Sequence, residues 1–169
     1  AAQYYAPVFQ QLFPSEQNQQ REIEKLCEGK DPGFGYGVLA QLMVEEWCGK
    51  HCNVVLTTNF DDMVADALYL YTNKKPLVIA HESLAGFVRL TRTRPLVVKL
   101  HGDARLAPMS TEEQTRRLSE AVEDVLKKLL GEMGLVFVGY GGNDRSIATA
   151  LANLPAKSLP LGIYWVGSS

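Results

Sequence analysis

Three apolar segments of this chain stop abruptly on polar residues or glycines, and this repeated plan constrains the fold more than any other feature. The segments are 54–61 (VVLTTNFD), 96–103 (LVVKLHGD) and 135–144 (LVFVGYGGND). Continuous apolar runs of this length are typical of parallel strands that are buried on both faces. Such strands leave mainly their carboxyl ends free for ligands, so the three ends predict one shared site at one edge of a sheet.

Helical and extended patterns alternate along the chain. Helical spacing of apolar residues covers 4–13, 16–27, 38–47, 61–71, 111–130 and 144–152. Extended patterns cover 53–58, 77–80, 86–90, 96–101, 135–140 and 161–166, and the turn formers of 30–37 predict a loop. Ser110 and Glu113 form a capping box at the start of the longest helix. The alternation predicts an α/β fold: a Rossmann-like, doubly wound, mostly parallel sheet with helices on both faces.

Composition narrows the class of protein. With 169 residues, 46% of them hydrophobic and 21% charged, the chain fits a single globular domain. A net charge of -2 offers no excess of positive charge for a nucleic acid backbone. The sequence has neither an apolar run of the roughly 20 residues that a membrane helix needs nor the plan of a signal peptide. We therefore expect a cytoplasmic protein with no nucleic acid or membrane partner.

The cysteines are expected to be free thiols. Cys27, Cys48 and Cys52 are odd in number and clustered, which does not suit a disulfide framework. Cys48 and Cys52 flank His51 and resemble half of a metal site, but a structural zinc needs four ligands and no second pair of cysteines follows. We predict no metal.

The two ends of the chain suggest a fragment of a longer protein. A dinucleotide-binding half usually opens with a strand, a glycine-rich turn and a helix that holds the pyrophosphate, whereas this chain opens with helical patterns and stops just after a strand. A missing central strand would leave two unpaired edges, which predicts an oligomeric or strand-exchanged state.

The three motifs, in this order, resemble those of bacterial sirtuin-like domains of the silent information regulator family. The resemblance runs from about Pro32 to Val166. It implies a Rossmann-like NAD-binding domain with a smaller helical part, so that residues 1–169 form a single domain in which 1–37 are the helical part and 38–169 the core.

The resemblance also implies roles for individual residues. Asn59 would lie by the nicotinamide ribose and orient the attacking group, and His101 would act as base toward a ribose hydroxyl. Asp61 would contact the nicotinamide carboxamide. The full set of implied cofactor-binding residues is Thr58, Asp61, Gly102, Gly139, Gly141, Asn143 and Asp144.

Two departures from the family sharpen the implied activity. Deacylating sirtuins carry a four-cysteine zinc module after the histidine motif, and residues 102–139 contain no cysteine. The glycine-rich phosphate loop is also absent. Relatives without the zinc module include NAD hydrolases, several of them effector domains in defence against phage. We therefore expect hydrolysis of NAD to nicotinamide and ADP-ribose, or a cyclic form of it, with flanking domains in the parent chain.

Simpler readings and other functions stay open. Asn59 could cap the helix that follows it, Asp61 could favour the helix dipole, and His101 could be a strand-end histidine satisfied by backbone. The glycines could only permit a tight turn. His51 and His81 are expected at the surface or in loops. The alternative functions are a non-catalytic module that binds NAD or an ADP-ribose derivative, and an NAD-dependent protein deacylase.

Overall fold

The computed structural model describes residues 5–45, 52–81, 84, 94–104, 120–142 and 144–167. Within these residues five short strands pair only in parallel. They are β1 (Val54–Thr57), β2 (Leu77–Ile79), β3 (Leu96–Lys99), β4 (Leu135–Val138) and β5 (Ile163–Val166). Six helices accompany them: α1 (Tyr5–Leu12), α2 (Glu16–Cys27), α3 (Phe34–Val44), α4 (Met63–Thr72), α6 (Glu120–Leu130) and α7 (Arg145–Ala152).

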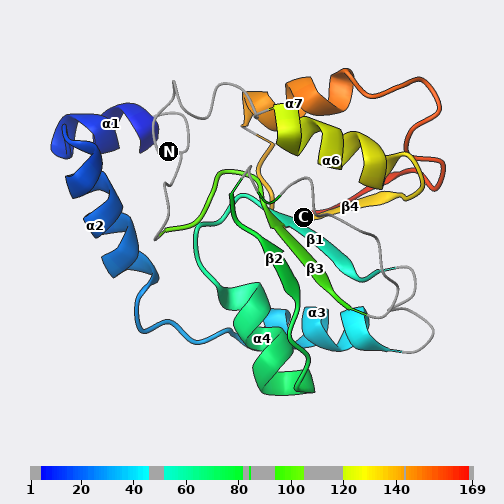
Figure 1. Cartoon of the computed structure of the whole chain (residues 1–169), viewed down its shortest axis with the longest axis horizontal. Coiled ribbons are helices and arrows are strands. Elements are labelled where there is room, and N and C mark those ends of the chain that lie inside the picture. The colour runs from blue at the N-terminus through cyan, green and yellow to red at the C-terminus, as the bar shows by residue number, and fades with distance from the viewer. Residues whose placement is uncertain are drawn as a thin grey trace.

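Helices cover both faces of the sheet that β1, β3 and β2 form in that order (Figure 1). Val97 of β3 points toward α3 and α4, where it joins a core with Met43 and Leu68. Its neighbours Leu96 and Val98 point the other way and pack in the core that includes α6 and α7. Successive residues of a strand face opposite sides, so the apolar residues Leu96, Val97 and Val98 of β3 supply both cores. The predicted α/β fold with parallel strands and helices on both faces is confirmed.

The strands of the described residues form two sheets rather than one. β4 and β5 pair with each other, with Leu135 opposite Ile163, and share no strand pairing with the sheet of β1, β3 and β2. Leu135 nevertheless packs against the same core as α6 and α7. This shared helical layer joins the two sheets.

Burial on both faces, which the apolar runs predict, holds for β3 but not for β4 and β5. Every residue of β5 is exposed, and in β4 Val136 and Val138 are exposed while Leu135 and Phe137 are partly buried. Only Leu135 of this pair packs against the core that includes α6 and α7 among the described residues, so β5 lies outside the helical cover. The predicted oligomeric or strand-exchanged state stays a prediction.

Helix α3 begins earlier than the sequence predicts. Residues 34–37 were expected in a loop because of their glycines, yet the helix starts at Phe34 with Gly33 as its N-cap. At Gly37 an added Cβ would lie 3.4 Å from the Tyr71 ring of α4, so the glycine lets the two helices approach closely. Packing between α3 and α4 thus outweighs the low helix propensity of glycine.

Helices α1 and α2 form a small separate layer. Phe9 and Ile23 pack together with Ala104, and Phe13, Cys27 and Phe60 surround them. Since Phe60 and Ala104 follow β1 and β3, this layer rests on the strand-end loops rather than on a face of the sheet. Helix α2 starts at Glu16, and its N-cap is Ser15, whose hydroxyl accepts a hydrogen bond from the Asn18 amide.

Two other predicted features lie outside the described residues. These are the strand at 86–90 and the first part of the helix at 111–130, with its capping box at Ser110 and Glu113. The described part of that helix, α6, buries Val122, Val125, Leu126 and Leu129 as predicted.

Leu68→Ala should destabilise the protein by about 2–5 kcal/mol, because Leu68 is 0% exposed and its removal leaves a cavity between α3, α4 and the sheet. Leu70→Ala, in the same helix at 61% exposure, is the matched control and should change stability by less than about 0.5 kcal/mol. Urea denaturation measures both. Equal losses would contradict this placement of the core.

Candidate functional site

The carboxyl ends of β1 and β3 lie side by side. Thr57 pairs with Lys99, and the Leu100 amide donates to the Thr57 carbonyl at 2.8 Å. Asn59 and His101 each follow two residues beyond that last pair. The structure therefore brings these two predicted residues to the same edge of the sheet, although no contact between them is described.

The loops that follow these strands are tied together by Lys99. Its side chain is 1% exposed, and its ammonium donates to the Phe60 carbonyl at 2.9 Å, to Asp62 Oδ1 at 2.7 Å and to Asp103 Oδ2. The three protons of the ammonium thus have three acceptors, as a buried cation requires. Sequence reasoning did not single out Lys99, yet a lysine inside a strand buried on both faces was a signal that acceptors surround it.

His101 is held by Asp144 from the other sheet. The His101 side chain is 6% exposed, and its Nε2 is hydrogen-bonded to Asp144 Oδ2. Its Nδ1 is buried and has no hydrogen-bond partner among the described residues. The simpler reading, a histidine satisfied by backbone, is wrong because the partner is a carboxylate.

Asp144 also begins helix α7. Its Oδ1 accepts from the Ser146 amide at 2.9 Å, the Ser146 hydroxyl at 2.7 Å and the Ile147 amide at 3.3 Å. Burial raises the pKa of this carboxyl, but hydrogen bonds from His101 and Ser146, the His101 charge and the Ile147 amide together lower the pKa from 3.8 to about 2. Asp144 is therefore an anion at neutral pH.

Asn59 does not cap the helix that follows it. Helix α4 starts at Met63, with Asp62 as N-cap, and the Met63 amide donates to Asp61 Oδ1 at 3.1 Å. The simpler reading of Asn59 is thus wrong, whereas Asp61 does support the helix start. Asn59 is exposed, and its Nδ2 lies 3.5 Å from the Tyr36 hydroxyl. Burial and the Asp61 charge raise the pKa of Tyr36 despite that contact, so its hydroxyl keeps its proton at neutral pH.

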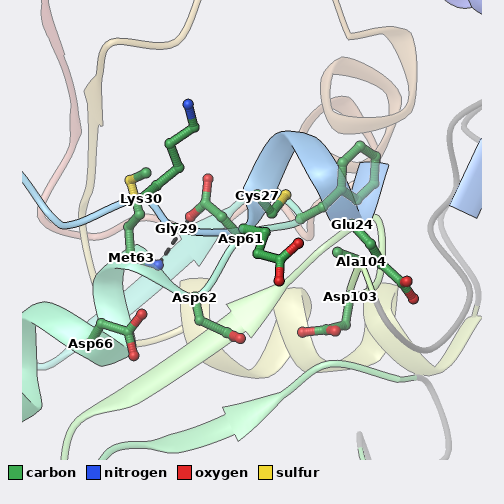
Figure 2. Close-up of a pocket in the computed structure, with 12 residues that line it drawn as sticks. Glu24, Cys27, Gly29, Lys30, Asp61, Asp62, Met63, Asp66, Asp103 and Ala104 are labelled. Atoms are coloured by element: carbon green, nitrogen blue, oxygen red, sulfur yellow. Dashed lines mark hydrogen bonds between the residues drawn. The ribbon is translucent and has the colours of Figure 1, made fainter. Parts of the chain in front are cut away.

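A pocket of about 420 Å³ opens between the end of α2 and the loops after β1 and β3 (Figure 2). The carboxylates of Asp62 and Asp103 point toward one another in this view, as their shared contact with Lys99 requires. Acidic residues dominate the lining: Glu24, Glu28, Asp61, Asp62, Asp66 and Asp103, with Lys30 as the basic member. The pKa of Cys27 in the same wall is raised, first by burial and next by the Asp61 charge.

This charge decides which ligand groups the edge can accept. The N-terminus of a helix usually favours anions, but α4 begins behind Asp61 and Asp62, and α7 behind Asp144. These carboxylates either occupy the helix N-termini themselves or would repel a phosphate placed there. The described edge suits cations and groups that donate hydrogen bonds, such as hydroxyls and amides.

The predicted glycine positions lie in turns at the same edge. Gly102 has a φ of 85° and Gly139 a φ of 65°, a region that side chains rarely adopt. Gly141 is exposed, Thr58 is partly buried, and Asn143 lies outside the described residues. Beside this turn Tyr140 packs near Trp165. Burial and the Asp144 charge raise the pKa of Tyr140 to about 12, so it remains a neutral phenol.

The described residues show neither a metal-binding cluster nor a membrane-spanning helix. No group of three or more His, Cys, Asp and Glu side chains is arranged to hold a metal ion in the part of the chain that the structure describes. None of its helices has the length and apolar character needed to cross a membrane.

A family model described as a SIR2-like domain matches residues 53–166. The match begins one residue before β1 and ends with β5, so it contains all five strands and the edge described above. Helices α1, α2 and α3 lie outside it. No curated protein matches the chain.

Lys99→Met should destabilise the protein by about 3–5 kcal/mol, because it removes the cation between two partly buried carboxylates and keeps a similar volume. Lys127→Met is the control: the Lys127 side chain is 41% exposed, and its ammonium contacts Glu123 and Asp124 on the surface of α6. Its loss should cost at most about 1 kcal/mol. Similar costs in urea denaturation would contradict the role of Lys99.

Asp144 should make stability fall in acid. The folded pKa is lowered from 3.8 to about 2, so the stabilisation is complete above about pH 4 and is lost as the pH falls through 2. The shift corresponds to about 2 kcal/mol. Asp144→Asn should lose less stability than the wild type between pH 5 and pH 2. Asp124→Asn, with a 75% exposed side chain, should follow the wild type, and an Asp144→Asn curve parallel to the wild type would contradict the assignment.

Proposed function

Because the chain belongs to the SIR2-like domain family, which fits an NAD-related function, we propose that it hydrolyses NAD to nicotinamide and ADP-ribose. The observation that carries the proposal is the placement of Asn59 and His101 at adjoining strand ends, with His101 fixed by Asp144. An amide can orient a water and an imidazole can accept a proton, so these two groups at one sheet edge suit hydrolysis at a ribose.

The proposed reaction breaks the bond between the nicotinamide nitrogen and the ribosyl carbon. Nicotinamide leaves as a neutral molecule with the electron pair, water forms the new carbon–oxygen bond, and the water proton is released. The protein then has to hold the sugar, exclude stray water and place one nucleophile. Asn59 can both donate and accept hydrogen bonds, which suits orienting that water. A neutral His101 can accept a proton from a ribose hydroxyl. A cyclic product would arise if a group of the same molecule replaced the water.

The charge of the edge supports the nicotinamide ribose end of NAD as the part held here. The pyridinium ring of NAD is cationic, and positive charge develops on the ribosyl carbon as the bond breaks, so nearby carboxylates favour both. Asp61 lines the acidic pocket and offers an acceptor for a carboxamide. The pyrophosphate needs other donors than the starts of α4 and α7, which their own aspartates occupy.

The other residues that the family resemblance implies would also contact the dinucleotide. Thr58, Gly102, Gly139, Gly141, Asn143 and Asp144 would line the path of the dinucleotide, together with Asp61. We further propose a cytoplasmic bacterial protein that acts in antiphage defence, as an oligomer and with flanking domains in the same polypeptide. The bacterial source, the role in defence and the flanking domains rest on the resemblance of the motifs, the cytoplasmic location on the sequence pattern, and the oligomer on the missing central strand.

The test is nicotinamide release from NAD by the longest natural polypeptide that contains residues 1–169, with and without an acetyl-lysine peptide. We expect release without peptide and a loss of about 10²–10⁴-fold in His101→Ala and Asn59→Ala, the range typical of a general base. His81→Ala, at an exposed position, should keep the activity.

Other outcomes would select the alternatives. Release only with peptide would make the domain a deacylase. Tight NAD binding without release, lost in Asn59→Ala, would make it a binding module. Thermal unfolding of each variant should accompany the assay, because His101 is buried and its removal also costs stability.

A further inference from the structure

His101 and Asp144 join two sheets that share no strand pairing among the residues that the structure describes. His101 follows β3 in one sheet, and Asp144 follows β4 in the other. Their side chains are mostly buried, at 6% and 19% exposure, and meet through Nε2 and Oδ2. A contact that spans two sheets and ends on a buried imidazole calls for a role beyond capping a helix.

We propose that Asp144 is the positioning residue of His101: it fixes the proton on Nε2 and thereby makes Nδ1 the nitrogen that accepts a proton. The proposal rests on the proposed function for the claim that His101 acts as base. The proton position itself follows from the contacts and is testable without NAD.

The contact with Asp144 decides which ring nitrogen of His101 carries the proton. A carboxylate only accepts hydrogen bonds, so the nitrogen that faces it must donate. A neutral imidazole carries one N–H, and with that proton on Nε2 the lone pair is on Nδ1. Nδ1 is buried without a partner among the described residues. Nδ1 is then a buried acceptor whose lone pair no described residue uses.

The Asp144 carboxylate is held in one orientation. Oδ1 of Asp144 is held by three donors, two from Ser146 and one from Ile147, which leaves Oδ2 aimed at His101. Ser146 and Ile147 are themselves buried, and Ile147 belongs to the core shared with α6. The carboxylate therefore cannot rotate away without breaking the start of α7. The sequence Asp144-Arg145-Ser146 supplies both the helix cap and the anchor of the imidazole.

Asp144→Asn separates the helix cap from the anchoring of the His101 proton. Asparagine caps helices as well as aspartate does, so Oδ1 can still accept from Ser146 and Ile147. Its Nδ2 then faces His101 and donates, which forces Nε2 to become the acceptor and moves the proton to Nδ1. The variant keeps the cap of α7 and moves the proton of the His101 ring from Nε2 to Nδ1.

The direct test is ¹⁵N NMR of the ring nitrogens in histidine-labelled protein without NAD, with the His101 signals isolated by His51→Gln and His81→Gln. We expect Nε2 protonated and Nδ1 bare in the wild type at a pH where the ring is neutral, and the reverse in Asp144→Asn. Asp124→Asn should leave the pattern unchanged. A wild-type proton on Nδ1, or an Asp144→Asn spectrum like the wild type, would overturn the proposal.

Kinetics distinguish positioning from contact with the dinucleotide. If Asp144 acts through His101, Asp144→Asn lowers kcat for nicotinamide release by about 10²–10⁴-fold and changes KM by only a few fold. A rise in KM with kcat kept would overturn the positioning role. Ser146→Ala, which removes one of the three donors, should give a smaller loss in kcat.

The two proposals fail in different ways. Absence of nicotinamide release from the wild type under all conditions would remove the proposed function, while the wild-type ring spectrum would still decide whether Asp144 fixes the proton of His101. Release with a wild-type proton on Nδ1 would keep the function and remove the positioning role.

Discussion

The arrangement of this edge depends on the buried ammonium of Lys99. Moving such a charge out of water costs several kcal/mol, and only close acceptors on all sides offset that cost. Here the acceptors come from two loops: Phe60 and Asp62 after β1, and Asp103 after β3. Because one cation needs all of them, the two loops have a fixed relative position. Asn59 and His101 belong to those loops, so the ion pairs of Lys99 also fix the positions of these two residues, and neither residue takes part in them.

The second constraint is the way in which the two sheets are joined. Within the described part of the chain no strand pairing links β4 and β5 to the other three strands, and the connection runs through the core under α6 and α7 and through His101 and Asp144. The distance between β3 and β4 is therefore set by side-chain packing. Any change in the shared core that shifts α7 would also move Asp144 relative to His101, so packing far from the edge controls the geometry of the imidazole.

Many of the strands and helices could be predicted from the sequence, because buried residues recur at the spacing of each kind of element. The apolar runs locate β1, β3 and β4, and the helical stripe Val122, Val125, Leu126 and Leu129 locates the described part of α6. The start of α3 could not be predicted, since its glycines disfavour a helix and the packing of Tyr71 of α4 against Gly37 leaves no local pattern. Nor could the exposure of β5, because an apolar strand looks the same whether or not a helix covers it. His101 and Asp144 were both candidates by motif, but their contact depends on how the two sheets pack, which no local pattern encodes.

The distribution of charge sets what the edge can recognise. A Rossmann-like fold usually offers the amides at a helix start to a phosphate. Here Asp144 uses the amides of Ser146 and Ile147, Asp61 accepts from Met63, and further carboxylates line the adjoining pocket. The same fold therefore presents acceptors where phosphate-binding domains present donors. An edge of this polarity suits cationic groups and groups that donate hydrogen bonds, and under the proposed function it would stabilise the positive charge that develops on a sugar carbon. The negative part of any dinucleotide bound here must be held by groups other than the helix starts of α4 and α7.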